Sequence, residues 1–561
     1  MDRRTFLTSA LGATGALALG SCQQRGGPRA VDTAPAGTPP PAPRPTLRLA
    51  GDDNGFPSPF AYQRGGGYVQ MSYIYDTLLW KDASGELIPW LARDFQGSPD
   101  GLTYTFRLRD GITWHDGRPL TAEDVAFSFT YFAAQQLSPT VIVQPVPDIA
   151  EVRATDERTV QFRLRNPVAT FLQFGGAGAV PIVPRHIWSS IQDAAKASDP
   201  QLLVGSGPYR LESYTPGEGA YLYSAYDDYF LGTPFVARIE NRPVGDELTA
   251  LRAGELDQAG SSGVRPDALA PFRDDPSFEI LEAPTGVSTL SLYWNLSRGG
   301  ALADVRFRRA CALAIDRNDM VTRLFGGNGV RGNPGWIPPG NPFHVEVEQY
   351  AFDPAAANRL LDEAGFTRPG PAGARRGPNG QPLRFELLVA GRPPPAVELV
   401  VRALGAVGVE LMPQALDTPT FNQRVIAGNT EMSLIGSGGM NSDLAPDYLR
   451  LVYSSQTKLT QHAQGYRNPE VDRLTQEQLQ TLDESKRKEI VARIQHLVAS
   501  DLPLLPLFYP DSFTVYRKEA FDQWYYTPGG VAGVIPTVNN RQVLVTGRQA
   551  GLEIRPFTRG G

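Results

Sequence analysis

Residues 98–129, "SPDGLTYTFRLRDGITWHDGRPLTAEDVAFSF", place a strand, a turn and the start of a helix in direct succession. Apolar and polar residues alternate over 102–109, which is typical of a half-buried strand. Thr121 and Asp124 follow as a capping-box pattern ahead of an apolar helical face. The stretch therefore predicts a strand, a tight connection and then a helix.

The alternation of strands and helices continues on both sides of this stretch. Residues 46–50 and 159–165 also alternate as strands do. A helix is predicted after Asp353, its N-cap, and it ends before Gly365. Residues 483–508 read as an amphipathic helix that leads into a buried strand. The sequence predicts a mixed α/β protein.

Length and charge limit the classes of protein that fit. At 561 residues the chain is too long for a single hydrophobic core, so two or three lobes are expected. Charged residues make up 20% and apolar residues 41%, as in a soluble globular protein. The net charge is −6 and no basic stripe is present, which argues against nucleic acid as a partner.

The N-terminus resembles a lipoprotein signal peptide. Arg3 and Arg4 precede a weakly apolar run that closes at Cys22. The resemblance implies that residues 1–21 are removed and that Cys22 is acylated, which would anchor an exported protein to the membrane. The arginine pair also resembles a twin-arginine signal, so both export routes stay open. The alternative is a short membrane helix, but the run of about 17 residues falls below the roughly 20 needed.

A proline-rich segment follows this leader. Residues 22–46 are rich in Pro, Ala and Gly and show no apolar periodicity, so they are expected to form an extended tether. No later apolar run is long enough to span a membrane.

Motifs for catalysis or metal binding are missing from the sequence. It contains no phosphate-binding loop, no H-E-x-x-H helix and no G-x-S-x-G elbow. The five histidines lack ligand spacing, so neither a metal nor a cofactor is expected. His115 and Asp116 are expected in a hairpin or loop, and Cys311 in the core of a helix. The protein is therefore not expected to be an enzyme.

Two glycine-rich segments could suggest phosphate binding. Gly205-Ser206-Gly207-Pro208 lacks the third glycine of a dinucleotide motif and is expected to be a tight turn that enters a strand. Residues 324–343 lack the required Lys and Ser/Thr and read as a long irregular loop. Trp336 within this loop either lines a cleft or anchors the loop.

Five blocks of sequence, in order, resemble one known family. They are "YDTLLWKDASGELIPWLARDF", the opening stretch, "VGSGPYRLESYTPGEGAYL", "LYWNLSRGGALADVRFRRACALAIDRNDMV" and "FDPAAANRLLDEAGF". Together they resemble the peptide-type (family 5) extracellular solute-binding proteins of ABC importers. The resemblance extends over roughly residues 46–520.

The resemblance implies two α/β lobes that are joined by two crossing segments, with an extra subdomain in the first lobe. The crossings are expected near 288–295 and 502–510. The ranges are 47–80, 204–284 and 508–561 for lobe one, 81–203 for its subdomain and 285–507 for lobe two.

The family also implies a function. A solute docks between the lobes, the lobes close around it, and an ABC permease complex receives it from a monomer that is periplasmic or on the cell surface. Short peptides are the expected solute. The alternatives are an oligosaccharide, an opine-like compound or a chelated metal, and from other classes a sensory receptor or an enzyme on the same fold.

Three places are expected to contact the solute by this resemblance. Asp53 and Asn54 follow the first strand, and strand alternation is expected to turn one of Tyr293 and Trp294 towards the solute. The full set is Asp53, Asn54, Tyr293, Trp294, Asn295, Gly436, Ser437, Gly438, Gly439, Met440, Asn441 and Asp443.

The segment from Gly436, "GSGGMNSDLAPDYL", is expected to be one wall of a ligand cleft. A peptide's terminal ammonium needs a carboxylate partner, and peptide-binding family members place an Asp here, shortly after a Trp. This segment has no such Trp, and Met440 stands near the expected position of the acid. Asp443 is the nearest substitute, whereas Asp447 reads as part of the turn into a helix.

Overall fold

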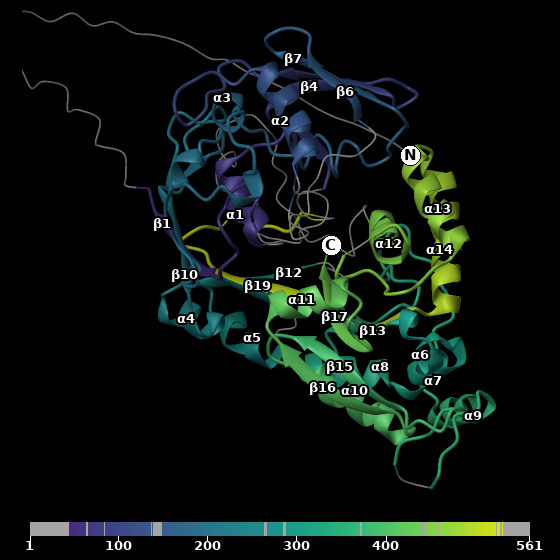
Figure 1. Ribbon diagram of the computed structural model, residues 1–561. Coiled ribbons are helices and arrows are strands. Elements are labelled where there is room, and N and C mark those ends of the chain that lie inside the picture. The colour runs from purple at the N-terminus through teal and green to yellow at the C-terminus, as the bar shows by residue number, and fades with distance from the viewer. Residues whose placement is uncertain are drawn as a thin grey trace, which may run out of the picture. The chain divides into compact units, whose positions relative to one another are not determined.

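The computed structural model describes residues 44–530 except 63–65, 83–84, 136, 138–148, 263–265, 284–287, 371–372, 439–444, 458, 523 and 528–529. All of them belong to the compact unit Arg44–Gly561 (Figure 1). The predicted leader, Cys22 and most of the tether lie outside the described residues. Gly439, Met440, Asn441 and Asp443 lie outside them as well.

A seven-stranded sheet of order β12-β19-β11-β1-β10-β9-β8 contains the first and the last strands of the described chain. β1 pairs in parallel with β10 and β11, and the other pairs are antiparallel. The strands are Thr46–Gly51 (β1), Tyr209–Thr215 (β8), Ala220–Ala225 (β9), Arg238–Pro243 (β10), Gln258–Ser262 (β11), Phe278–Glu282 (β12) and Ser512–Arg517 (β19).

A six-stranded sheet of order β14-β18-β13-β17-β15-β16 holds the strands between β12 and β19. β15 pairs in parallel with β16 and β17, and the remaining pairs are antiparallel. The strands are Ser288–Trp294 (β13), Gly329–Arg331 (β14), Arg384–Ala390 (β15), Glu410–Leu416 (β16), Met432–Gly438 (β17) and Leu504–Pro510 (β18).

The chain passes between these two sheets twice. It leaves the seven-stranded sheet after Glu282 and enters the six-stranded sheet at Ser288. It returns between Pro510 and Ser512, so a single residue separates β18 from β19. The strands on either side of these passages pair with each other, β12 with β19 and β13 with β18, as a pair of crossing segments requires.

A smaller layer lies between β1 and β8 in the sequence. Its antiparallel sheet has the order β4-β5-β7-β6, and β2 and β3 form a separate pair. The strands are Leu79–Lys81 (β2), Leu87–Pro89 (β3), Ala92–Gly97 (β4), Thr103–Leu108 (β5), Ile149–Ala154 (β6) and Thr159–Leu164 (β7).

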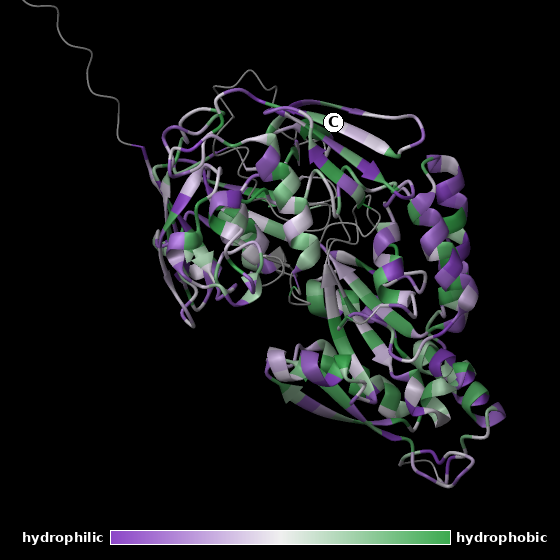
Figure 2. Ribbon diagram, turned by 45° about the horizontal axis from the view of Figure 1, so that its top comes forward, coloured by the Kyte–Doolittle hydropathy of each residue, from purple (hydrophilic) through white to green (hydrophobic). Residues whose placement is uncertain are grey.

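Helices flank the seven-, six- and four-stranded sheets (Figure 1). In Figure 2, the helices that Figure 1 labels α13 and α14 are coloured largely as hydrophilic. The helices are Gly66–Ile74 (α1), Ala122–Ala134 (α2), Arg185–Trp188 (α3), Glu247–Ala253 (α4), Pro266–Arg273 (α5), Gly300–Ala303 (α6), Val305–Ala314 (α7), Arg317–Phe325 (α8), Pro354–Glu363 (α9), Ala396–Ala406 (α10), Thr418–Ile426 (α11), Ala445–Tyr453 (α12), Pro469–Gln480 (α13) and Glu484–Asp501 (α14).

The buried apolar side chains of the described residues form four clusters. The largest joins one face of the seven-stranded sheet, through Leu47 and Tyr223, to the four-stranded sheet through Phe106 and Phe162. A small cluster covers the other face of the seven-stranded sheet. Two more lie on the opposite faces of the six-stranded sheet. The four-stranded layer therefore shares its core with the first sheet and is not an independent domain.

Local sequence signals predicted several elements correctly. The opening stretch forms β5 and α2, and the Asp124 carboxylate accepts hydrogen bonds from the backbone and hydroxyl of Thr121. Asp353 caps α9 by accepting from the Ala356 N–H at 2.8 Å. Gly365, just past the end of α9, has a φ of 82°, a backbone conformation that glycine adopts without strain.

The G-x-G segment is the predicted turn before β8. A Cβ atom on Gly205 would lie 1.8 Å from the Ile74 carbonyl oxygen, and one on Gly207 would lie 2.5 Å from the Tyr73 carbonyl oxygen. Between them Ser206 donates to the buried Asp76 carboxylate at 2.9 Å. The two glycines therefore let this turn lie against the end of α1.

Three other predicted positions are structural. His115 lies in a hairpin in which the Trp114 N–H donates to the Arg118 carbonyl. Cys311 is completely buried on α7. Trp336 is also completely buried, and its ring packs edge-on against Tyr453 with centroids 6.1 Å apart. Of the two alternatives for Trp336, the structure supports the anchor of the loop.

Candidate solute-binding site

The turn after β1 holds Asp53 in a fixed position. Its carboxylate accepts from the Tyr214 hydroxyl at 2.6 Å and from the Gly217 N–H at 2.8 Å. The hydrogen bond from Tyr214 is the main reason that the pKa of Asp53 is lowered. Because its pKa is lowered, Asp53 is negatively charged at neutral pH, and its side chain is exposed to solvent.

Asn54 is held by Tyr221, whose ring stacks on that of Tyr214. Its backbone N–H donates to the Tyr221 hydroxyl at 3.1 Å, and that hydroxyl donates to the Gly55 carbonyl at 2.8 Å. The rings of Tyr214 and Tyr221 stack with centroids 4.7 Å apart. The hydroxyls of these two stacked tyrosines, on β8 and β9, thus hold the turn with Asp53 and Asn54 in place through hydrogen bonds.

Tyr293 and Trp294 lie on opposite faces of β13, as strand alternation predicts. Tyr293 belongs to the cluster on one face of the six-stranded sheet and Trp294 to the cluster on the other. Both are buried, with exposed fractions of 2% and 0%. Helices cover both faces of the sheet, so neither ring is exposed here, and the prediction that one of them faces the solute stays a prediction.

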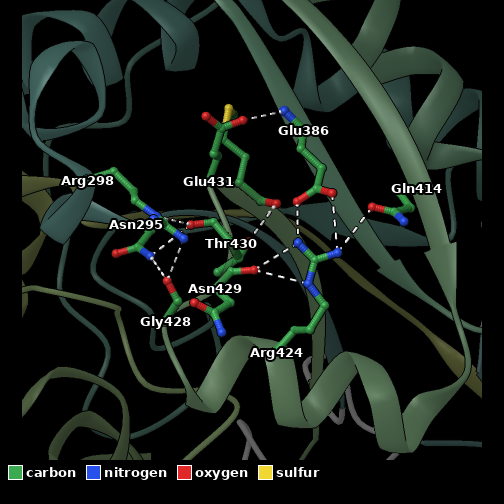
Figure 3. Close-up of polar contacts among 10 residues, drawn as sticks. Asn295, Arg298, Glu386, Gln414, Arg424, Gly428, Asn429, Thr430 and Glu431 are labelled. Atoms are coloured by element: carbon green, nitrogen blue, oxygen red, sulfur yellow. Dashed lines mark hydrogen bonds and ion pairs between the residues drawn. The ribbon is translucent and has the colours of Figure 1, made fainter.

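Asn295 connects β13 to a turn that lies far away in the sequence (Figure 3). Its Nδ2 atom donates to the carbonyls of Gly428 and Thr430 at 3.0 and 2.8 Å. Its Oδ1 atom accepts from the Ser297 backbone N–H and hydroxyl. With these hydrogen-bonding groups in use and only 2% of the residue exposed, Asn295 has a structural role.

Two arginines complete this contact. Arg298 donates to the Gly428 and Thr430 carbonyls, and Arg424 donates to the Asn429 carbonyl between them. Arg424 also pairs with Glu386 at 2.8 Å (Figure 3). We refer to Asn295, Arg298, Arg424 and the carbonyls of 428–430 as the carbonyl clamp. It fixes the turn that precedes β17.

Gly436, Ser437 and Gly438 form the other end of β17. Gly436 is exposed, and a Cβ atom placed on it would meet only the Thr289 carbonyl oxygen, at 3.9 Å. The space beside it is therefore open, as expected where a ligand approaches a backbone. The following residues, 439–444, lie outside the described part of the chain.

The register of β13 and β17 separates the predicted residues into two groups. Ser288 pairs with Gly438, whereas Trp294 pairs with Met432. At about 3.4 Å per residue the two ends of this pair lie about 20 Å apart. The structure therefore places Asn295 at one end of the strands and Gly438 at the other. They do not belong to one small site.

Asp447 is a buried acid near the Gly438 end of β17, whereas its sequence pattern predicts only a turn into a helix. It lies in the first turn of α12 with 2% of its surface exposed, and its Oδ2 atom is 3.4 Å from Nη2 of Arg487. Burial raises the pKa of the Asp447 carboxyl, and Arg487 opposes that rise. Its partner lies 40 residues away in the sequence, so no local pattern could have shown the pair.

Over the described parts of 44–530, no three His, Cys, Asp or Glu side chains lie close enough together to hold a metal ion. The described helices also include none with the length and hydrophobicity that a membrane span requires.

The fold and the exposed strand ends define a two-lobed α/β binding protein, with its lobes built on the two large sheets. Residues 86–459 match the family of bacterial extracellular solute-binding proteins, family 5. The chain belongs to this family, whose members serve ABC importers, and the predicted family and fold class are confirmed.

Named relatives agree with this assignment. The chain is 30% identical over 392 residues to a Brucella ovis protein that carries the name ABC transporter peptide-binding protein, covering 67% of this chain and 70% of that protein. It is 26% identical to the dipeptide-binding protein of Escherichia coli K12, covering 84% and 90% of the two chains.

Solved structures show the same fold. NikA from Brucella suis in complex with Fe(III)-EDTA superposes with a TM-score of 0.72 at 23% identity, over 88% of this chain and 100% of that one. DppA from Helicobacter pylori in complex with the peptide STSA has a TM-score of 0.72 at 21% identity, over 88% and 98%.

Proposed function

We propose that this protein binds short peptides between its two lobes and delivers them to the permease of an ABC importer. The observation that carries the proposal is the double passage between two separately packed sheets, combined with membership of the family. Two short connections between paired strands allow a hinge rotation that closes the lobes on a solute. Relatives with names that describe peptide binding support a peptide as the solute.

The predicted ranges of the lobes are part of this proposal. Lobe one would comprise 47–80, 204–284 and 508–561, its subdomain 81–203, and lobe two 285–507. Every strand from β13 to β18 lies in the six-stranded sheet, which supports this division except at 508–510, where the end of β18 still pairs within that sheet.

The proposed solute contacts come from both lobes. Asp53 and Asn54 would contribute from the turn after β1, and Gly436, Ser437 and Gly438 from the exposed end of β17. Gly439, Met440, Asn441 and Asp443 would complete the second wall. Extended peptides offer main-chain groups to such strand ends, which gives affinity that does not depend on the side chains.

A non-peptide solute is the second candidate. The segment from Gly436 has Met440 near the position where peptide-binding relatives carry an acid, so the anchor for a terminal ammonium differs. Structures of similar fold hold Fe(III)-EDTA in one protein and agropinic acid in another. The protein would then deliver a chelated metal or an opine-like compound to the permease in the same way.

The location of the protein follows from the N-terminal sequence. We propose that Cys22 is acylated after removal of residues 1–21 and that 22–46 tether a monomer outside the cytoplasm. The Arg3-Arg4 pair, the apolar run and the cysteine at its end support this proposal. Mass spectrometry of the membrane-extracted protein would detect the lipid mass on a fragment that begins at Cys22.

Native mass spectrometry of the protein as purified tests the solute. Peptide masses that are released on denaturation are expected. A carbohydrate or a metal chelate would overturn the peptide assignment and leave the transport role in place. Absence of any solute, together with no binding of a peptide library, would contradict the proposed function itself.

A further inference from the structure

A direct contact joins the four-stranded layer to the helices beside the six-stranded sheet. The Ala169 N–H, in the segment after β7, donates to the Leu479 carbonyl near the end of α13 at 2.8 Å. Leu479 and Tyr448 pack against the core that contains the first sheet. The Leu482 side chain lies so close to Gly101 that a Cβ atom there would be 2.6 Å away.

A buried polar group lies beside this backbone bond. The Asp447 carboxylate is paired with Arg487, and Nε of Arg487 donates to the Gln478 Oε1 atom at 3.0 Å. Thr170, the residue after Ala169, is 3% exposed, and its side chain is among the polar groups that lower the pKa of the Asp447 carboxyl. Asp447 therefore has polar neighbours on its own helices and on the layer that belongs to the first sheet.

This contact would be lost if the four-stranded layer moved away from α12, α13 and α14. A buried carboxylate depends on every donor around it, because a charge in a water-poor environment is costly without partners. If the layer moved away, Asp447 would lose the Thr170 hydroxyl and the Ala169 bond would break in the same step. Arg487 and Gln478 would stay with Asp447, because they lie on α14 and α13 of the same side.

We propose that Ala169, Thr170, Asp447, Gln478, Leu479 and Arg487 form an interlobe latch that sets the balance between open and closed lobes. The inference rests on the proposed function, because it assumes a hinge between the lobes. The latch lies outside the two chain passages. Its contacts can therefore hold the two lobes together while the backbone of the passages stays free to rotate. Solute affinity then depends on Thr170, since apparent affinity scales with the population of the binding-competent state.

The experiment compares Thr170→Val with a matched control in the full chain. Valine keeps the shape of threonine and removes the hydroxyl. Thr430→Val is the control, because Thr430 is also buried and its hydroxyl donates to the Met432 carbonyl within the six-stranded unit. Spin labels at Glu151→Cys and Glu477→Cys, on exposed side chains of the two sides, report the distance between them.

The latch predicts a specific pattern. In the solute-free protein, Thr170→Val shifts the distance distribution towards longer values, and the Kd for trialanine rises about threefold to tenfold. Thr430→Val changes neither the distance distribution nor the Kd. This difference is expected even if Thr170→Val and Thr430→Val lower the melting temperature equally. Thr170→Ser, which retains the hydroxyl, restores both quantities. If Thr170→Val fails to fold, Leu482→Ala trims the contact with Gly101 at an exposed position and serves the same test.

Two outcomes separate the proposals. Unchanged distances in both Thr170→Val and Leu482→Ala would overturn the latch, whatever the protein binds. A longer distance in a protein that binds neither trialanine nor any other peptide would support the latch and contradict peptide binding.

Discussion

The side-chain nitrogen of Asn295 lies 2.8 Å from the carbonyl oxygen of Thr430, and this hydrogen bond joins the end of β13 to the turn before β17. Asn295→Ala would leave buried carbonyls with fewer donors. We expect the free energy of unfolding to fall by about 1–3 kcal/mol and the solute Kd to stay unchanged. Chemical denaturation and calorimetry measure the two quantities. Asn318→Ala, at an exposed position, is the control, and a raised Kd in Asn295→Ala would return Asn295 to the solute site.

Asp443→Asn tests the proposed anchor for a peptide ammonium. A buried charge that loses its partner costs binding energy, so we expect peptide affinity to fall by about 2–3 kcal/mol. Asp274→Asn, at an exposed position between α5 and β12, should leave affinity within experimental error. Calorimetry with a peptide whose N-terminus is acetylated should show no difference between Asp443→Asn and the parent protein. Equal affinity for an unmodified peptide would remove Asp443 from the site.

Gly205→Ala tests the close approach of the turn before β8 to α1. Its Cβ atom would lie 1.8 Å from the Ile74 carbonyl oxygen, so the backbone must move. We expect a loss of about 3 kcal/mol in the free energy of unfolding. Gly245→Ala, where no atom lies within 4 Å, should change it by less than about 0.5 kcal/mol. Similar denaturation midpoints for both variants would contradict this packing.

His115 makes stability depend on pH. Its Nδ1 atom accepts from the Gly205 N–H at 3.3 Å and its Nε2 atom faces the Gly207 carbonyl at 2.9 Å, which fixes a neutral ring. Burial lowers the pKa of His115 to about 4. Between this value and the ordinary value of 6.5 the unfolded chain binds the extra proton, so stability falls as the pH drops below about 6.5.

The size of the His115 effect can be measured by substitution. The contribution should reach about 1 kcal/mol at pH 5.5 and about 3 kcal/mol near pH 4. His115→Gln should remove this part of the pH dependence, whereas His496→Gln, on an exposed surface, should retain it. Denaturant unfolding between pH 5 and 8 gives the comparison, and parallel profiles for His115→Gln and the parent would show that His115 titrates normally.

Local signals in the sequence were sufficient for much of the fold. The Thr121–Asp124 capping box, the Asp353 cap and the alternation over β5 and β7 involve residues that are close in sequence, and these elements form where predicted. The turn at Gly205 could also be predicted, although its reason, the carbonyls at the end of α1, becomes visible only in three dimensions.

The candidate site was harder to predict because its contacts are distant in sequence. Alternation placed Tyr293 and Trp294 on opposite faces, but it could not show that helices cover both faces. Asn295 followed these residues in the chain, yet its partners at 428–430 give it a structural role. Asp447 looked like a helix start, and only the packing of α12 on α14 shows that it is buried beside Arg487.

The antiparallel pairing of β12 with β19 has a consequence for the architecture. Glu282 lies opposite Phe513, so the two points at which the chain leaves and re-enters the first sheet are neighbours. The whole six-stranded unit is therefore an insertion at the tip of a hairpin. A short turn between Glu282 and Ser512 would restore that hairpin. The first sheet and its four-stranded layer are therefore a candidate for expression as a separate single-lobed protein. The same junction could accept a fluorescent reporter in place of the excised unit.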